Sequence, residues 1–136
     1  MTSQELYSRW LRRRASAHAK RDRARGHSCS VSAYKDAIHQ AVVVSKGRDS
    51  YTGESLDWSL LSTYDNEASK NGKHLYKAKF ALLPTVDHFE ASSKIVSFKV
   101  CAWRTNDAKN DLSHKDFVDL CKRVLEHRGY IVASKG

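Results

Sequence analysis

The chain has 136 residues, of which 40% are hydrophobic and 29% charged, and its formal net charge is +9. That length allows one domain with a hydrophobic core, and the hydrophobic share excludes a disordered composition. No apolar run reaches the ~18 residues of a membrane span, and no signal-peptide-like apolar stretch is present. We therefore expect a folded cytoplasmic domain without membrane contact, with nucleic acid as the first candidate partner for the positive charge.

The charge is concentrated at the N-terminus, where the first 26 residues carry eight lysines and arginines against two acids. The apolar positions Leu6 and Trp10, followed by alanine-rich basic turns, predict a helix over residues 3–26 with a broad cationic face. We interpret residues 1–28 as a basic helical arm; a solvated face without a ligand is the alternative. The residues expected to contact phosphates are Arg12, Arg13, Arg14, Lys20 and Arg21.

Residues 30–47 predict a second helix, in which Ser32 is the expected N-cap and Gly47 the stop. Its apolar positions recur at helical spacing, as in a core helix. The run Val42 to Val44 also fits a strand, because β-branched residues favour that structure. After this helix, Thr52 and Gly53 predict a turn.

Two strands are predicted in the second half of the chain. Alternating residues between Leu75 and Leu82 predict the first, and residues 95–103 predict the second. Pro84 has no N–H for a strand ladder, so the first strand is expected to lie at an edge or to break there. A polar loop follows it.

A helix is predicted over most of residues 104–130, with Ser113 as a cap within it and Gly129 as its stop. Its apolar side chains fall on one face, which consists of Phe117, Leu120, Cys121, Val124 and Leu125. Cys101 and Cys121 are expected to be core residues. The three cysteines form no C-x-x-C pair, so we expect no structural zinc.

An adjacent acid and imidazole, Asp87 and His88, close the first predicted strand, and Asn106 opens the helix after the second. A strand–strand–helix unit can bring Asn106 back toward Asp87. Carboxylate and amide oxygens suit Mg²⁺ or Mn²⁺, which keep water and phosphate oxygens as further ligands. A neighbouring histidine can take a proton from water near neutral pH. The chemistry this combination serves is metal-assisted phosphodiester hydrolysis.

The segments "TVDHF" and "FKVCAWRTNDAKNDLS" resemble the HNH, or His-Me finger, endonuclease family, in which an Asp-His pair ends a strand and an Asn-x-x-Lys signature lies on the following helix. The resemblance implies an α+β fold with a ββα-metal core at about residues 80–121, within a nuclease domain over residues 29–136, flanked by N-terminal helices and a C-terminal helix. It also implies that His88 is the general base and that Asp87 and Asn106 bind one divalent cation. The phosphate contacts implied are Lys109 and Arg104.

These observations predict a divalent-metal-dependent DNA endonuclease that acts on duplex DNA; an RNA substrate stays open. The alternative is a nucleic-acid-binding module with the same fold and no turnover. The six other histidines are expected at the surface or at helix ends. Of these, His74 and His114 are the two whose proximity to the cleft is of interest. The recognition sequence, nicking versus double-strand cutting and the oligomeric state do not follow from the sequence.

Overall fold

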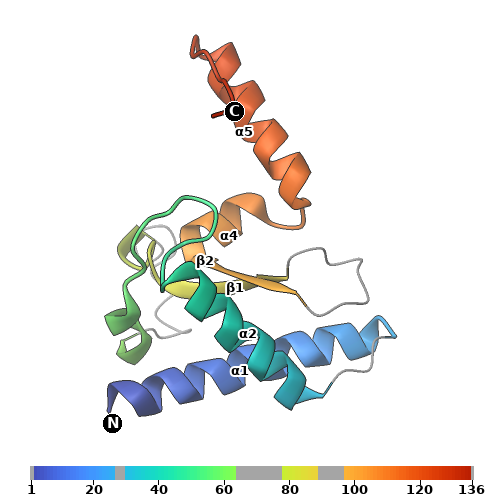
Figure 1. Cartoon of the computed structure of the whole chain (residues 1–136), viewed down its shortest axis with the longest axis vertical. Coiled ribbons are helices and arrows are strands. Elements are labelled where there is room, and N and C mark those ends of the chain that lie inside the picture. Colours follow the sequence, from blue (N-terminus) through green and yellow to red (C-terminus); the bar gives the residue numbers. More distant parts are fainter. Residues whose placement is uncertain (1, 27–29, 64–77, 89–96, 136) are drawn as a thin grey trace.

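A computed structural model describes residues 2–26, 30–63, 78–88 and 97–135. Within these residues the chain forms four α-helices, one 3-10 helix and a two-stranded antiparallel sheet, which confirms the predicted α+β class (Figure 1). No helix in the described part is both long and apolar enough to cross a membrane. The elements are α1 (Ser3–Ala24), α2 (Val31–Ser45), η1 (Trp58–Ser62), β1 (Pro84–His88), β2 (Phe98–Ala102), α4 (Trp103–Lys109) and α5 (His114–His127).

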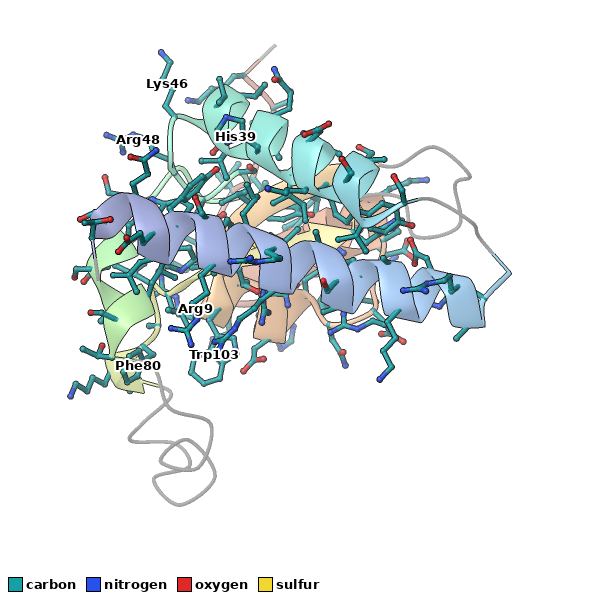
Figure 2. The ribbon with its side chains drawn as sticks, turned by 90° about the horizontal axis from the view of Figure 1, so that it is seen from below. Arg9, His39, Lys46, Arg48, Phe80 and Trp103 are labelled. Carbon is teal, nitrogen blue, oxygen red and sulfur yellow. The ribbon has the colours of Figure 1, made fainter. Side chains whose placement is uncertain are left out.

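The predicted N-terminal helix is confirmed as α1. It begins with a capping box, in which Thr2 Oγ1 accepts the Glu5 N–H and the Glu5 carboxylate accepts the Thr2 N–H. Its buried residues Trp10, Leu11 and Ala15 belong to the same hydrophobic core as those of α2 and both strands. Figure 2 shows α1 beside α2, with charged side chains on its outer surface. The expected domain boundary falls at residues 27–29, outside the described residues.

The second predicted helix is confirmed as α2, with one correction at its start. The N-cap is Ser30 and not Ser32, because the Ser30 hydroxyl accepts the Ala33 N–H. The helix continues through the three valines to Ser45, so the strand alternative for them is wrong. Lys46 and Gly47 then adopt positive φ angles of 57° and 73°. The Gly47 N–H donates to the Val42 carbonyl and ends the helix near the predicted position.

The first strand lies later in the chain than predicted. Residues 75–77 are outside the described residues, and residues 78–83 form a helical turn and a bend that buries Phe80, so the predicted strand is wrong there. The alternation of apolar and polar residues in this segment is too short to distinguish a strand from a turn that buries one side chain. Pro84 begins β1, a position where its missing N–H costs no ladder hydrogen bond. β1 pairs antiparallel with β2, whose position agrees with the predicted second strand.

The single helix predicted over residues 104–130 is two helices. Asn110, with φ 51°, ends α4, and the Ser113 hydroxyl accepts the Asp116 N–H to cap α5. No side chain of α5 is buried. On the predicted face, Leu120, Val124 and Leu125 are 41–54% exposed, whereas Phe117 is half-buried and packs edge-to-face on Tyr51. The apolar face predicted for this helix is therefore present on α5, but it lies outside the hydrophobic core of the described part. Cys121 on α5 is exposed, against the prediction, whereas Cys101 is buried as predicted.

Candidate active site

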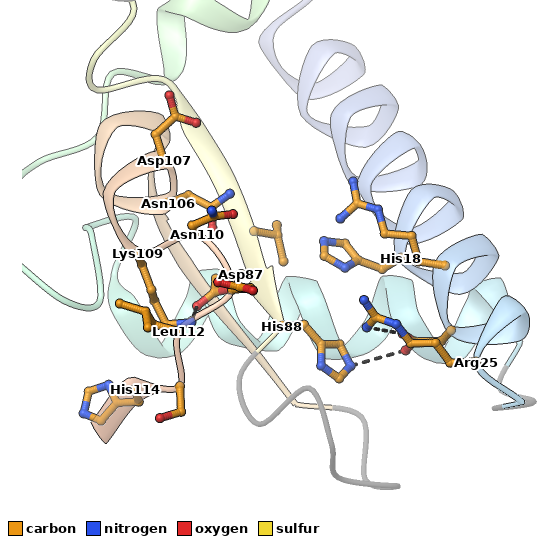
Figure 3. A pocket seen from close by; sticks show the side chains of 15 residues that line it. His18, Arg25, Asp87, His88, Asn106, Asp107, Lys109, Asn110, Leu112 and His114 are labelled. Carbon is orange, nitrogen blue, oxygen red and sulfur yellow. Dashed lines mark ion pairs between the residues drawn. The ribbon is translucent and has the colours of Figure 1, made fainter. Parts of the chain in front are cut away.

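A cleft of about 820 Å³ lies where α1, the end of β1 and the segment from α4 to the start of α5 meet (Figure 3). Four residues predicted for the site line it: Asp87, His88, Asn106 and Lys109. β1 and β2 run antiparallel and α4 follows directly, so Asp87 and Asn106 reach the same wall of the cleft. The sequence therefore predicted correctly which of these residues come together.

Asp87 and His88 point to opposite sides of β1 because successive side chains alternate along a strand. Asp87 faces α4, where its Oδ2 lies 3.0 Å from Lys109 Nζ. The same Oδ2 accepts a hydrogen bond of 2.5 Å from the Tyr51 hydroxyl. Burial and this hydrogen bond raise the pKa of Tyr51 well above its usual value, so the phenol stays a donor. Asp87 Oδ1 has no hydrogen bond or ion pair with the described residues.

Lys109 is 4% exposed, and its charge is placed by the ion pair with the equally buried Asp87. Removing one member of such a pair leaves an uncompensated buried charge, so the two residues depend on each other. Lys109 also lines the cleft, where its ammonium adds positive charge next to the candidate metal ligand. It is therefore both a partner of Asp87 and a candidate contact for a phosphate.

His88 faces α1. Its Nε2 lies 3.3 Å from Asp22 Oδ2, while its buried Nδ1 has no hydrogen-bond partner among the described residues. The ring packs edge-to-face on Phe98, with 5.1 Å between centroids. A carboxylate beside one ring nitrogen favours the tautomer that carries its proton there.

Asp22 is a residue of this site that the sequence analysis missed. It is 5% exposed, and its Oδ2 also accepts a hydrogen bond from the Tyr34 hydroxyl of α2. A signal for it exists in the sequence, because Asp22 continues the stripe of Leu11 and Ala15 at helical spacing. A carboxylate on the apolar stripe of a basic helix must have buried partners.

His18 lines the cleft one turn before Asp22 and corrects the expectation of a surface histidine, since it is 6% exposed. Its ring stacks on that of His88, with 6.2 Å between centroids. Burial, followed by the nearby positive charge of Arg21 and the His88 ring, lowers the pKa of His18 to about 4. His18 is thus a neutral group beside His88. His114 also lines the cleft, stacked on Tyr51, whereas His74 lies outside the described residues.

The residues on the α4 wall fit a hard divalent cation in their chemistry. Figure 3 shows Asn106 and Asn110 on the same side of the cleft as Asp87, so amide and carboxylate oxygens gather there. Within the described residues no group of three His, Cys, Asp or Glu side chains is placed to hold a metal. A cation here would take few protein ligands and keep water or phosphate oxygens, as Mg²⁺ does.

Besides Lys109, the predicted phosphate contacts lie in four kinds of position: in the cleft, in an ion pair outside it, in a second groove, and on exposed surface outside both. Arg21 lines the cleft together with Arg25. Arg104 lies outside it and forms an ion pair of 2.5 Å with Glu54. Arg13 and Arg14 line a second groove, nearer the N-terminus of α1. Arg12 and Lys20 are exposed and line neither the cleft nor this groove.

Comparison of the chain with protein-family models, with curated proteins and with solved structures gives no match. The resemblance to HNH endonucleases therefore depends on the residues quoted above and on their placement around the cleft.

Proposed function

We propose that the protein is a divalent-metal-dependent endonuclease of the HNH type that hydrolyses phosphodiester bonds in DNA. One observation carries the proposal: the Asp-His pair at the end of β1 and the Asn and Lys of α4 line one cleft. The basic side chains of Arg21 and Arg25 border that cleft and suit a phosphate backbone. We thus propose membership of the HNH family, hydrolysis of phosphodiester bonds, and Asp87 and Asn106 as metal ligands.

In this reaction His88 is the general base. Its imidazole accepts a proton from a water molecule, whose oxygen attacks phosphorus while the bond to the leaving oxygen breaks. Asp22 holds Nε2 and stabilises the positive charge that the ring gains, as a carboxylate does beside a catalytic histidine. His18 stays neutral, so it adds no charge that would oppose protonation of His88.

Asp87 and Asn106 are the proposed ligands of one Mg²⁺ or Mn²⁺. Such a cation, when bound, neutralises charge on the phosphate and on the leaving oxygen. Tyr51 and Lys109 fix the Asp87 carboxylate through Oδ2, which leaves Oδ1 available on the cleft side. A buried carboxylate held by two donors keeps its orientation at little entropic cost on binding.

The test is nicking of supercoiled plasmid in Mg²⁺, Mn²⁺ or EDTA. His88→Ala is expected to lower the rate by about 10²–10⁴, the usual contribution of a general base, while DNA binding in a gel shift is retained. His127→Ala, at the exposed end of α5, is the matched control and should cleave normally. Asn106→Ala should require more metal for half-maximal cleavage.

Two outcomes would contradict the proposal. Unchanged cleavage by His88→Ala would remove His88 as the base. Binding of DNA by the wild-type protein without nicking under any of the divalent ions would favour the alternative, a nucleic-acid-binding module without turnover.

A further inference from the structure

A second groove, of about 250 Å³, lies beside the N-terminal half of α1. We call it the arginine groove; its lining includes Arg9, Arg13, Arg14, Pro84, Thr85 and Trp103. Figure 2 shows Arg9 and Trp103 on the same side of α1. Leucine side chains and the buried Trp10 complete its walls, and no aspartate or glutamate lines it within the described residues. The groove therefore combines positive charge with an aromatic and aliphatic wall.

Arginine side chains beside an aromatic and aliphatic wall favour one chemical class of ligand. Guanidinium groups bind phosphate through paired hydrogen bonds, and the flat face of an indole stacks on a nucleobase. An acidic peptide would use the arginines but offers no flat ring to the aromatic wall. A nucleotide uses both, because it joins a phosphate to a flat ring.

The arginine groove and the cleft lie along the same two elements, α1 and β1. α1 places Arg9 to Arg14 at the groove and Arg21 at the cleft, and β1 places Thr85 at the groove and His88 at the cleft. The two elements run side by side in the same direction: Trp10 Nε1 donates to the Pro84 carbonyl at 3.3 Å, and Asp22 lies next to His88. A strand of nucleic acid can follow this path.

The length of β1 between Thr85 and His88 sets the distance between the groove and a phosphate bound at His88. From Thr85 to His88 the strand advances by about 10 Å at ~3.3 Å per residue. One strand of duplex DNA advances ~3.4 Å per nucleotide along its axis. The groove is thus about three nucleotides from a phosphate at His88, and fewer if the strand is stretched.

We propose that the arginine groove is a nucleotide-binding subsite, in which Arg9 and Arg13 bind a phosphate and Trp103 stacks on the adjoining base. Binding in this groove follows from its own residues. Its distance from the cleaved bond, and its assignment to the substrate strand, rest on the proposed nuclease function.

The test is a titration of tryptophan fluorescence in EDTA, so that no cleavage occurs. The probes are a single-stranded 12-mer oligonucleotide, a free deoxynucleoside monophosphate, inorganic phosphate and polyglutamate. We expect the oligonucleotide to quench fluorescence at the lowest concentration, polyglutamate to give no quenching, and Trp103→Phe to lose the quenching that Trp58→Phe retains. Arg13→Gln should weaken oligonucleotide binding at least fivefold. Arg23→Gln removes an exposed arginine from the same helix outside both hollows and should weaken binding less than twofold.

Full quenching in Trp103→Phe, or equal losses in Arg13→Gln and Arg23→Gln, would overturn the subsite. Quenching by polyglutamate at the same concentration would reassign the groove to acidic peptides, and quenching by the free nucleotide alone would overturn the link to a strand. Because Trp103 is half-buried, Arg9→Gln serves as a second variant with an exposed side chain, and it should behave like Arg13→Gln. Plasmid nicking measured in parallel separates the two proposals, since quenching without nicking retains the subsite and rejects the nuclease.

Discussion

Three histidines of this chain differ in what surrounds them more than in their position in the sequence. His88 has a carboxylate beside Nε2, His18 is buried beside arginines, and His114 stacks on Tyr51 at the start of α5. Of these three, His88 is the one that forms an ion pair with a carboxylate, and the role of base that we propose for it depends on that contact. The roles of single residues in this cleft therefore follow from their neighbours across α1, β1 and α5.

His18 gives a prediction about pH. Its folded-state pKa of about 4 is below the 6.5 of an ordinary histidine, so between these values the unfolded chain binds more protons than the folded one. Stability from this residue is therefore complete above pH 6.5 and is lost as the pH falls toward 4. We expect wild-type protein to lose about 2 kcal/mol more unfolding free energy than His18→Gln between pH 7 and pH 5, measured by urea denaturation.

The control for this measurement is His127→Gln, which changes an exposed histidine on α5. Its stability should follow the wild-type curve across the same pH range. If the unfolding free energies of His18→Gln and wild type fall in parallel as the pH is lowered, the loss of stability in acid is not due to His18.

At the residue scale the sequence predicts best where an ordered motif carries the chemistry. Asp87, His88, Asn106 and Lys109 line one cleft, as predicted from their order along the chain. Asp22 and Tyr51 escaped prediction because each acts through a long-range contact, one from α1 to β1 and the other across 36 residues to Asp87. Spacing along a chain carries little information about such contacts.

At the scale of elements, Asp49 connects the turn after α2 to the junction of β2 and α4. Its Oδ1 accepts the N–H groups of Tyr51 and Thr52, and its Oδ2 accepts the Ala102 N–H and the Thr105 hydroxyl. It is 1% exposed. This carboxylate fixes the turn that carries Tyr51 and the first turn of α4. It thereby positions the two segments that supply Tyr51 and Lys109, the hydrogen-bond and ion-pair partners of Asp87.

Asp49→Ala is therefore expected to lower the free energy of unfolding by about 3 kcal/mol, because it leaves a buried backbone N–H and a buried hydroxyl without acceptors. Asp57→Ala is the matched change, since exposed Asp57 caps η1 through the Ser59 N–H. A cap of that kind contributes about 1 kcal/mol. Equal losses in chemical denaturation would show that Asp49 is an ordinary cap.

Element types were easier to predict than their ends. α1 and α2 followed from caps and apolar spacing, which are local signals. The start of β1 and the break between α4 and α5 did not, because both depend on the environment of one residue. Pro84 is placed at a strand start by its pairing with Ala102, and Asn110 adopts a positive φ that a helical pattern does not reveal.

At the scale of the whole molecule, the positive charge and the exposed apolar surface lie on different parts. The first 26 residues hold +6 of the net charge of +9. α5 extends away from the other elements in Figure 1, and its start contacts Tyr51 through His114 and Phe117. The charged surface is thus beside the cleft and the groove, where a polyanion would meet the proposed catalytic residues.

This distribution predicts a local salt dependence of DNA binding. Each phosphate neutralised by a protein cation contributes about −0.9 to the slope of log K against log salt concentration on duplex DNA. If Arg21 and Arg25 each contact one phosphate at the cleft, the double variant Arg21→Gln/Arg25→Gln should reduce the slope by about 1.8, measured by fluorescence anisotropy in EDTA. The variant Lys122→Gln/Arg123→Gln removes the same charge from exposed α5 and should leave the slope unchanged. Equal slopes for the two variants would mean that net charge alone attracts DNA, and that α1 does not bind it at the cleft.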